Sequence, residues 1–485
     1  MNYKLILKLA GSMLVTEALF MLVPFVVSLI YGGGDHWAFL LSILVVAGAG
    51  VLLSLLKPKN KTFRTWDAYA AATVSWFLLS VFGALPFIIS GCFSSITDCI
   101  FESVSGFTTT GATVLTDIEL LPKGILFWRS LSQWIGGMGV LMFVMAAAST
   151  MHASSVNLLR AESTGPSPDK IVPKIRETAK ITCLIYLSMT ALLVILLCVS
   201  GLPVYDSLIT SFSTAGTGGF SNMNASISAY GNTAAEIIIT VFMFLFGISF
   251  TLYFMLLNRK FRKFFMDEEL RLYFVITAAA IAVVTINVYA SGLYGSISES
   301  LRHSSFQISS VISTTTFSTV DYQYWPTLSK VILVTLMIFG GCAGSTSGGT
   351  KIMRVLLMAK AARIELSRLF RPGVIKTVTV NGKKIGADLV SRSALFFFVY
   401  SAIFLVAAAL VSIEGKDIVS STTAVIAALS NIGPGLEIIS PSGNYSVFTP
   451  FSKIVLSFCM VAGRLEFFPV LVFFSPSIWK KGLMK

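Results

Sequence analysis

Four short segments rich in glycine, threonine and serine carry the residues best suited to chemistry in this chain. They read Phe107-Thr-Thr-Thr-Gly111-Ala-Thr113, Ser213-Thr-Ala-Gly-Thr-Gly218-Gly-Phe220, Ser313-Thr-Thr-Thr316-Phe317 and Leu429-Ser-Asn-Ile-Gly433-Pro-Gly435. Backbone carbonyls and threonine hydroxyls in such turns are oxygen ligands for a cation, and glycine permits the backbone angles that expose the carbonyls. Aligning Gly111, Gly218, Thr316 and Gly433 gives spacings of 107, 98 and 117 residues. The segments therefore recur with the period of a repeated structural unit.

Each polar turn follows a short apolar stretch, at 98–108, 205–214, 300–313 and 418–430. Stretches of this length are too short to cross a bilayer and favour re-entrant helices. We expect Asp98, Asp206, Ser298 and Asp417 to be their N-caps. The C-terminal end of a helix carries about half a negative charge, so four such ends around one axis favour a cation. The candidate ligands are Thr110, Gly111, Thr217, Gly218, Thr315, Thr316, Ile432 and Gly433.

The composition places these turns in a membrane. Of the 485 residues, 55% are hydrophobic and only 12% are charged, with a mean hydropathy of +0.81. So few charges cannot cover a soluble surface, which excludes a cytosolic enzyme, a secreted disulfide scaffold and a nucleic-acid-binding domain. Ten apolar stretches are long enough to span: 5–31, 36–56, 67–91, 125–150, 178–200, 232–257, 271–292, 328–359, 391–412 and 452–475.

Charge predicts the orientation. Basic clusters lie around 57–64, 160–180, 259–263 and 351–392, and the other connections carry few basic residues, so the clusters mark the cytoplasmic side and both termini face inward. The outer connections are acidic and include Asp98, Glu102 and Asp206. These acids either concentrate cations at a pore mouth or are the ordinary counterpart of basic residues kept inside.

The sequence thus predicts an all-α polytopic membrane protein. Two N-terminal spans (1–60) precede four pseudo-symmetric units of span, re-entrant pore helix and span. The family resemblance described next implies that the four units surround one central pore. The units are expected at 61–165, 166–265, 266–385 and 386–485.

Three further motifs complete a family pattern: Trp128-Arg-Ser-Leu-Ser-Gln-Trp-Ile-Gly-Gly-Met-Gly139, Gly340-Gly-Cys-Ala-Gly-Ser-Thr-Ser-Gly-Gly-Thr-Lys351 and Gly463-Arg-Leu-Glu466. With the four turns, the chain resembles the membrane subunit of Trk/Ktr-type potassium uptake systems, in the TrkH branch. The resemblance implies potassium uptake through a filter-lined, gated pore in a bacterial cytoplasmic membrane. It also implies a homodimer in membrane lipid, a cytoplasmic TrkA-type nucleotide-binding regulatory subunit, and no enzymatic activity, no cofactor and no nucleic-acid partner.

The glycine-rich segment 340–349 breaks an expected span. Exposed backbone survives in a bilayer only when it is buried in protein or lines water. The segment is not a phosphate-binding loop, because Gly349 is followed by Thr-Lys-Ile instead of Lys-Ser/Thr. It is either a packing kink or, as the resemblance implies, a gate under the filter. The gate would comprise Gly344, Ser345, Thr346, Ser347, Gly348, Gly349 and Arg464.

Single residues leave some alternatives open. Arg464, inside the last span, is either an electrostatic barrier to cations or half of a salt bridge between units. Arg129 is expected to contact an outer acid or carbonyls. Thr316 replaces the glycine usual in this family, so weaker discrimination against sodium is expected. A less selective K⁺/Na⁺ channel and a proton- or sodium-coupled symporter are the alternatives; for the second, Glu17 is the titratable group within a span.

The basic stretch 351–384, with a turn at Asn381-Gly382, is either a docking site for the regulatory subunit or a plain cytoplasmic loop.

Overall fold

The protein is described by a computed structural model that covers residues 2–58, 65–150, 175–371 and 376–474. The regular secondary structure of these residues is almost entirely helical. The two strands that occur among them, β1 (Thr379–Val380) and β2 (Lys383–Lys384), pair antiparallel. They flank Asn381 and Gly382, which both have positive φ, so the expected turn is a short β-hairpin.

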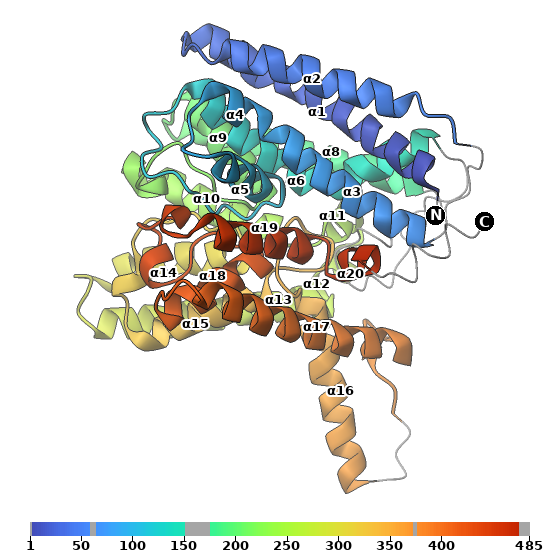
Figure 1. Cartoon of the computed structure of the whole chain (residues 1–485). Helices are drawn as coiled ribbons and strands as arrows, with labels where there is room; N and C mark the ends of the chain where they lie inside the picture. The colour runs from blue at the N-terminus through green and yellow to red at the C-terminus, as the bar shows by residue number, and fades with distance from the viewer. Residues whose placement is uncertain (1, 59–64, 151–174, 372–375, 475–485) are drawn as a thin grey trace.

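Long apolar helices form the body of the molecule. Six helices in the described ranges are long and apolar enough to cross a membrane without interruption. They are α1 (Tyr3–Tyr31), α2 (His36–Ser54), α3 (Thr65–Gly83) continued by α4 (Leu85–Ser90), α8 (Ile175–Val199), α13 (Glu268–Ala290) and α17 (Ala387–Ser412). Helix α6 (Lys123–Thr150) occupies the predicted span 125–150. The two N-terminal helices pack against each other as an antiparallel pair at the edge of the bundle (Figure 1).

Three of the ten predicted spans are interrupted. The break in 328–359 was expected from its glycines, whereas the other two correct the expectation of continuous helices. The stretch 232–257 divides into α10 (Thr233–Phe246) and α11 (Phe250–Leu257), which meet at 94°. The stretch 328–359 divides into α15 (Thr327–Phe339) and α16 (Ile352–Phe370), and 452–475 into α19 (Pro450–Arg464) and α20 (Phe468–Phe474).

The breaks have identifiable causes. The break between α15 and α16, here called the intramembrane loop (340–351), contains glycines with positive φ at 340, 344 and 349. The carbonyl of Gly247, at the break between α10 and α11, accepts from the amide of Cys342 in this loop at 2.8 Å. After α19 the chain reverses through Glu466 and Phe467, at φ 56° and 63°. Hydropathy alone does not detect such breaks, because the residues around them remain apolar.

The four short helices form as expected: α5 (Ile96–Phe107), α9 (Val204–Gly216), α14 (Ile297–Ile312) and α18 (Ile418–Leu429). Their N-caps differ from the prediction in three cases. Ser95 caps α5, Pro203 precedes α9 without a side-chain cap, and Ser296 caps α14; only Asp417 caps as expected. Helices α5, α9 and α14 start one to three residues earlier than the apolar pattern, and α18 starts at the predicted residue, directly after its cap Asp417.

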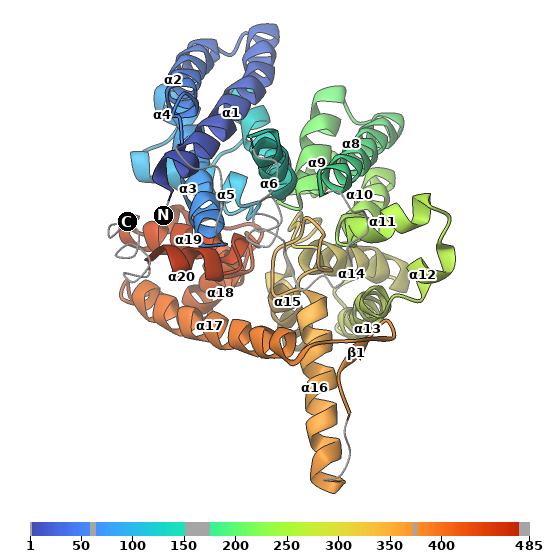
Figure 2. The same ribbon diagram turned by 90° about the vertical axis from the view of Figure 1, so that its right-hand side faces the viewer.

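Viewed end-on, the helices group around a centre in chain order. Figure 2 shows α1 to α6, then α8 to α11, then α13 to α15, then α17 to α20 as successive groups around the molecule. Helix α16 projects away from the bundle in both views (Figures 1 and 2). The remaining elements are α12 (Phe261–Phe265) and the 3₁₀ helices η1 (Ser226–Tyr230), η2 (Tyr322–Tyr324), η3 (Glu437–Ile439) and η4 (Tyr445–Val447). Much of the basic clusters 57–64 and 160–180, and the C-terminal end, lie outside the described residues.

Candidate functional site

The four polar turns converge on one cavity. A cavity of about 130 Å³ is lined by Gly111, Gly219, Thr316 and Gly433, one residue from each turn. Each turn follows directly on the C-terminal end of its short helix. Four partial negative charges and the carbonyls of four turns therefore surround a common space. The sequence predicted that the four turns converge, and in the structure they line the same cavity.

The backbone fixes how the turns correspond. The amides of Thr110, Gly218, Thr315 and Ile432 each donate to the carbonyl five residues earlier, at 2.7 to 2.9 Å. The preceding residue has positive φ in all four turns. Filter turns 1 to 4 are therefore 108–111, 216–219, 313–316 and 430–433, so that Gly219 is the counterpart of Gly111.

This register corrects one predicted pair. The sequence alignment matched Gly218 with Gly111 and proposed Thr217 and Gly218 as ligands, whereas the equivalent pair is Gly218 and Gly219. Two adjacent glycines make a one-residue shift invisible to an alignment by residue type. The hydrogen bonds remove the ambiguity because each turn closes on its own helix.

The turns approach so closely that a side chain would not fit at three of the four equivalent positions. A Cβ on Gly111 would overlap with the carbonyl oxygen of Gly218, and a Cβ on Gly219 with that of Thr315. A Cβ on Gly433 would overlap with the carbonyl of Gly111. Gly111 and Gly219 also have φ of 78° and 75°, which disfavour any L side chain. The result is a narrow constriction in which backbone oxygens of one turn face the next.

Thr316 occupies the equivalent position in filter turn 3 and adopts the same left-handed backbone, with φ of 61°. Of the two outcomes open for a β-branched residue here, a reoriented turn or a strained one, the structure has the strained one. Its Oγ1 would lie 2.8 Å from a Cβ on Gly219 and has no hydrogen-bond partner in the described part of the chain. The hydroxyl is thus an additional oxygen at the constriction.

Helix α6 supports filter turns 1 and 2 from behind, which explains the motif 128–139. The side-chain amide of Gln133 donates to the carbonyl of Gly218 at 2.8 Å, and its oxygen accepts from the amide of Phe220 at 3.0 Å. A Cβ on Gly136 would overlap with the carbonyl of Phe107, so the helix packs directly on the end of α5. Gln133 was not predicted from the sequence. The available signal was a polar residue inside a predicted span, just before the glycines at 136, 137 and 139.

Arg129, on the same helix, contacts an outer acid and a carbonyl, as expected. It donates to Glu102 Oε1 at 2.8 Å and to the carbonyl of Ser221 at 3.1 Å. Glu102 also accepts from Thr113 Oγ1 at 2.9 Å and from the amide of Val114 at 3.0 Å. Both charged groups are fully buried. This ion pair joins α5 to the segments that follow filter turns 1 and 2.

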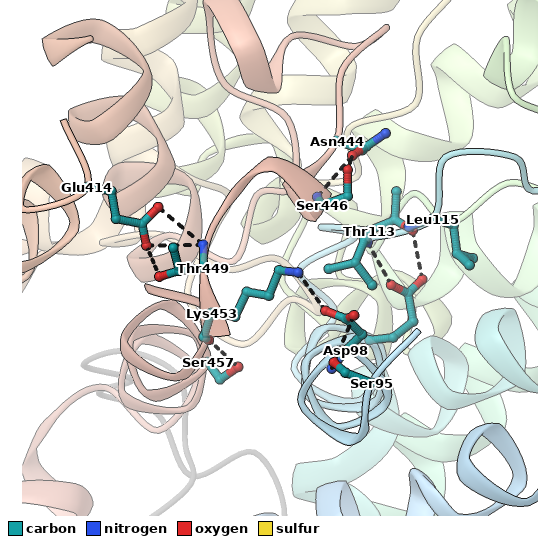
Figure 3. A network of polar contacts seen from close by, with 12 residues as sticks. Ser95, Asp98, Thr113, Leu115, Glu414, Asn444, Ser446, Thr449, Lys453 and Ser457 are labelled. Carbon is teal, nitrogen blue, oxygen red and sulfur yellow. Dashed lines mark hydrogen bonds and ion pairs between the residues drawn. The ribbon is translucent and has the colours of Figure 1, made fainter. Parts of the chain in front are cut away.

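A second buried ion pair joins the last unit to the first. Lys453 on α19 reaches Asp98 on α5 at 2.6 Å, and Asp98 accepts also from Ser95 at 2.9 Å (Figure 3). Asp98 and Glu102 were expected among the acids of an outer mouth. In the structure both acids form ion pairs that hold neighbouring helices together. These two acids are therefore structural contacts and do not concentrate cations.

The intramembrane loop lies against filter turns 3 and 4. The amide of Gly348 donates to Thr314 Oγ1 at 2.7 Å, and a Cβ on Gly348 would overlap with the carbonyl of Ser430. The polar side chains of Ser345, Thr346 and Ser347 are buried. The predicted gate residues 344–349 are thus brought together directly beside the filter.

Arg464 joins this loop to another unit. It donates to the carbonyl of Thr346 at 2.8 Å and to that of Gly136 on α6, also at 2.8 Å. It is the last residue of α19 and not the middle of a continuous span, since the helix ends there. Glu466 does not face it, as expected, and pairs with Arg354 instead.

Two charged residues at the loop were not foreseen. Lys351 is buried and donates to the carbonyl of Ser347. Glu269 is buried and accepts from the amides of Ala343 at 2.6 Å and Met353 at 3.0 Å, at the two ends of the loop. The sequence analysis placed Lys351 in the basic cytoplasmic stretch 351–392 and made no prediction for Glu269, and only the folded loop brings both side chains inside.

Comparison with known proteins agrees with this geometry. Residues 37–481 match the family model described as TrkH, cation transport protein. The chain is 34% identical to the Trk system potassium uptake protein TrkH of Halomonas elongata and 33% identical to that of Escherichia coli K12, over 99% of this chain and 100% of each relative. The crystal structure of the potassium transporter TrkH from Vibrio parahaemolyticus superposes with a TM-score of 0.90 at 32% identity, covering 99% of this chain and 100% of that one. The chain therefore belongs to the TrkH family of cation transport proteins.

Proposed function

We propose that the chain takes up potassium through one central pore, with filter turns 1 to 4 as the selectivity filter. The observation that carries the proposal is the cavity lined by one residue from each turn, with neighbouring turns in backbone contact. Carbonyl oxygens at such a constriction replace the water of a dehydrated cation. The related Trk potassium uptake proteins support potassium as the ion.

The intramembrane loop is the gate of this pore. It lies against filter turns 3 and 4 and is held by Arg464, which contacts both the loop and α6. Arginine is permanently charged, and its guanidinium beside the ion path opposes a cation electrostatically. Opening requires the contacts of Thr346 and Gly348 to break. Helix α16 continues the loop, so a force on α16 acts on these contacts.

The TrkH family and the projecting arm, which consists of α16 and the β-hairpin, support a regulatory partner and a homodimer. Helix α16 projects from the bundle and carries Arg363 and Arg368; Arg371 directly follows it, and the β-hairpin comes after (Figure 2). This arm is the docking site of a TrkA-type cytoplasmic nucleotide-binding subunit, and the protein works as a homodimer in a bacterial inner membrane. Both termini and α16 then face the cytoplasm. With unit boundaries at 61, 166, 266 and 386, each of the four units contains one pore helix.

The second candidate is a less selective K⁺/Na⁺ channel, and Thr316 favours it. Its Oγ1 adds an oxygen ligand that the other three turns lack, and its strained backbone loosens the geometry of one quarter of the filter. A filter with an adaptable quarter holds the smaller sodium ion more easily than a rigid one. Coupled symport finds less support, because Glu17 lies outside the lining of the cavity.

The test is Gly219→Ser, compared with Gly292→Ser. Both glycines have φ near 75°, so the backbone strain is matched, but only the Cβ at 219 meets a carbonyl, whereas nothing lies within 4 Å at 292. Growth of an uptake-deficient cell on limiting potassium should fail with the first variant and persist with the second. Equal growth of both would refute the filter assignment.

A further inference from the structure

A buried carboxyl group lies among α1, α3, α5 and α6, and it is not among the residues that line the filter cavity. Glu17, on α1, is 1% exposed. Neither of its carboxyl oxygens has a hydrogen-bond partner among the described residues. It lines an enclosed space of about 10 Å³, which has room for about one water molecule. The other lining residues are apolar or glycine: Met13, Trp76, Leu79, Phe107, Ile135, Gly136 and Gly139.

The elements packed against α1 offer this group no counter-ion. Helices α2, α3 and α6 pack on α1. Their titratable groups, with Asp35 before α2, are His36, Asp67, Tyr69, Lys123 and Arg129, and none lines the space. Asp35 accepts from Ile125, Asp67 from the amide of Asn2, and Arg129 is bonded to Glu102. Arg464 lies over the ring of Trp76, with its Cζ 5.8 Å from the ring centroid.

An ionised carboxylate without a partner is costly in such surroundings, whereas the protonated acid is tolerated. We propose that Glu17 is a proton-binding site, and that filter turn 1 responds to whether the proton is bound. The ligand is a single proton, held on a neutral carboxyl group at neutral pH. Glu17 does not line the filter cavity, so the bound proton regulates conduction and is not carried across the membrane together with potassium.

The route to the filter is one of direct contacts. Gly83 lies between Glu17 and Phe107: a Cβ there would be 2.9 Å from Glu17 Oε1 and would overlap with the Phe107 ring. Trp128 Nε1 donates to the carbonyl of Gly83 at 2.9 Å. Phe107 is the last residue of α5 and immediately precedes filter turn 1. Loss of the proton places a charge, and the water it attracts, behind this ring.

Infrared difference spectroscopy of the purified chain tests the first half of the proposal. At neutral pH the spectrum of wild type minus Glu17→Gln should contain the carbonyl band of a protonated carboxyl group. The control is Glu365→Gln, since Glu365 is 67% exposed and paired with Arg368, and its removal should leave that band region unchanged. Absence of a band lost with Glu17 would mean an ionised group and would overturn the site, whatever the pore does.

Potassium flux tests the second half. Glu17→Gln mimics the protonated form, so its uptake should equal that of wild type at neutral pH. At strongly alkaline pH wild type should reversibly lose most of its uptake while Glu17→Gln keeps it. Identical pH profiles of the two proteins would overturn the link to filter turn 1. Failure of the filter assignment itself is distinguishable, because it is read from Gly219→Ser at neutral pH.

Discussion

The contact between Thr314 and Gly348 is the most direct test of the gate, because it joins the intramembrane loop to the filter. Thr314 Oγ1 accepts from the amide of Gly348 at 2.7 Å, and both residues are buried. Thr314→Val keeps the shape and the β-branching, and so keeps whatever strain the φ of 60° imposes. It removes the acceptor, and the amide of Gly348 remains buried without its partner.

The expected size of the effect follows from that loss. A buried amide deprived of its acceptor costs about 1–3 kcal/mol, and this cost falls only on the arrangement in which the loop lies against the filter. At 1.4 kcal/mol for each factor of ten, the equilibrium shifts toward the displaced loop by roughly 5- to 150-fold. Basal potassium flux through the chain without its partner should rise accordingly, up to the point at which the loop is mostly displaced.

The assay is tracer flux into proteoliposomes that contain this chain alone. Thr314→Ser is the control, since it keeps the hydroxyl and should conduct as wild type does. Equal flux of the valine and serine variants, with unchanged thermal stability, would refute the coupling of loop and filter through this bond.

Three further outcomes are expected. Arg464→Ala removes one charged hydrogen bond to the loop, worth about 1.5–3 kcal/mol, and should raise basal flux at least tenfold, whereas flux equal to wild type would leave Arg464 as a structural contact only. Thr316→Gly removes the left-handed strain, about 1–2 kcal/mol, and should raise both thermal stability and the potassium-to-sodium permeability ratio from reversal potentials; an unchanged ratio would show that filter turn 3 contributes little. Gln133→Leu leaves the carbonyl of Gly218 and the amide of Phe220 unpaired, at about 1–3 kcal/mol each. This variant should lower the melting temperature and potassium uptake together. Full uptake would contradict the supporting role of Gln133.

The comparison of sequence and structure separates local from long-range information. The four short helices, the break at 340–349 and the contacts of Arg129 could be predicted, because each depends on local hydropathy, glycine content or the cost of an unpaired charge in a membrane. Three of the four N-caps and the register of filter turn 2 were wrong by one to three residues, whereas the N-cap Asp417 was correct. Such shifts depend on single hydrogen bonds, which residue types do not specify.

The sequence by itself determined the class of the protein, its repeated turns and the segments that we propose as filter and gate. It did so because a bilayer tolerates few arrangements of polar backbone, so glycine-rich breaks and short helices have few alternatives. Only the tertiary structure decided which residues meet across units. Gln133 with Gly218, Lys453 with Asp98, and Arg464 with Gly136 join segments that lie 85, 355 and 328 residues apart. Pairings over such separations arise from the closure of four units around one axis, and no local pattern encodes that closure.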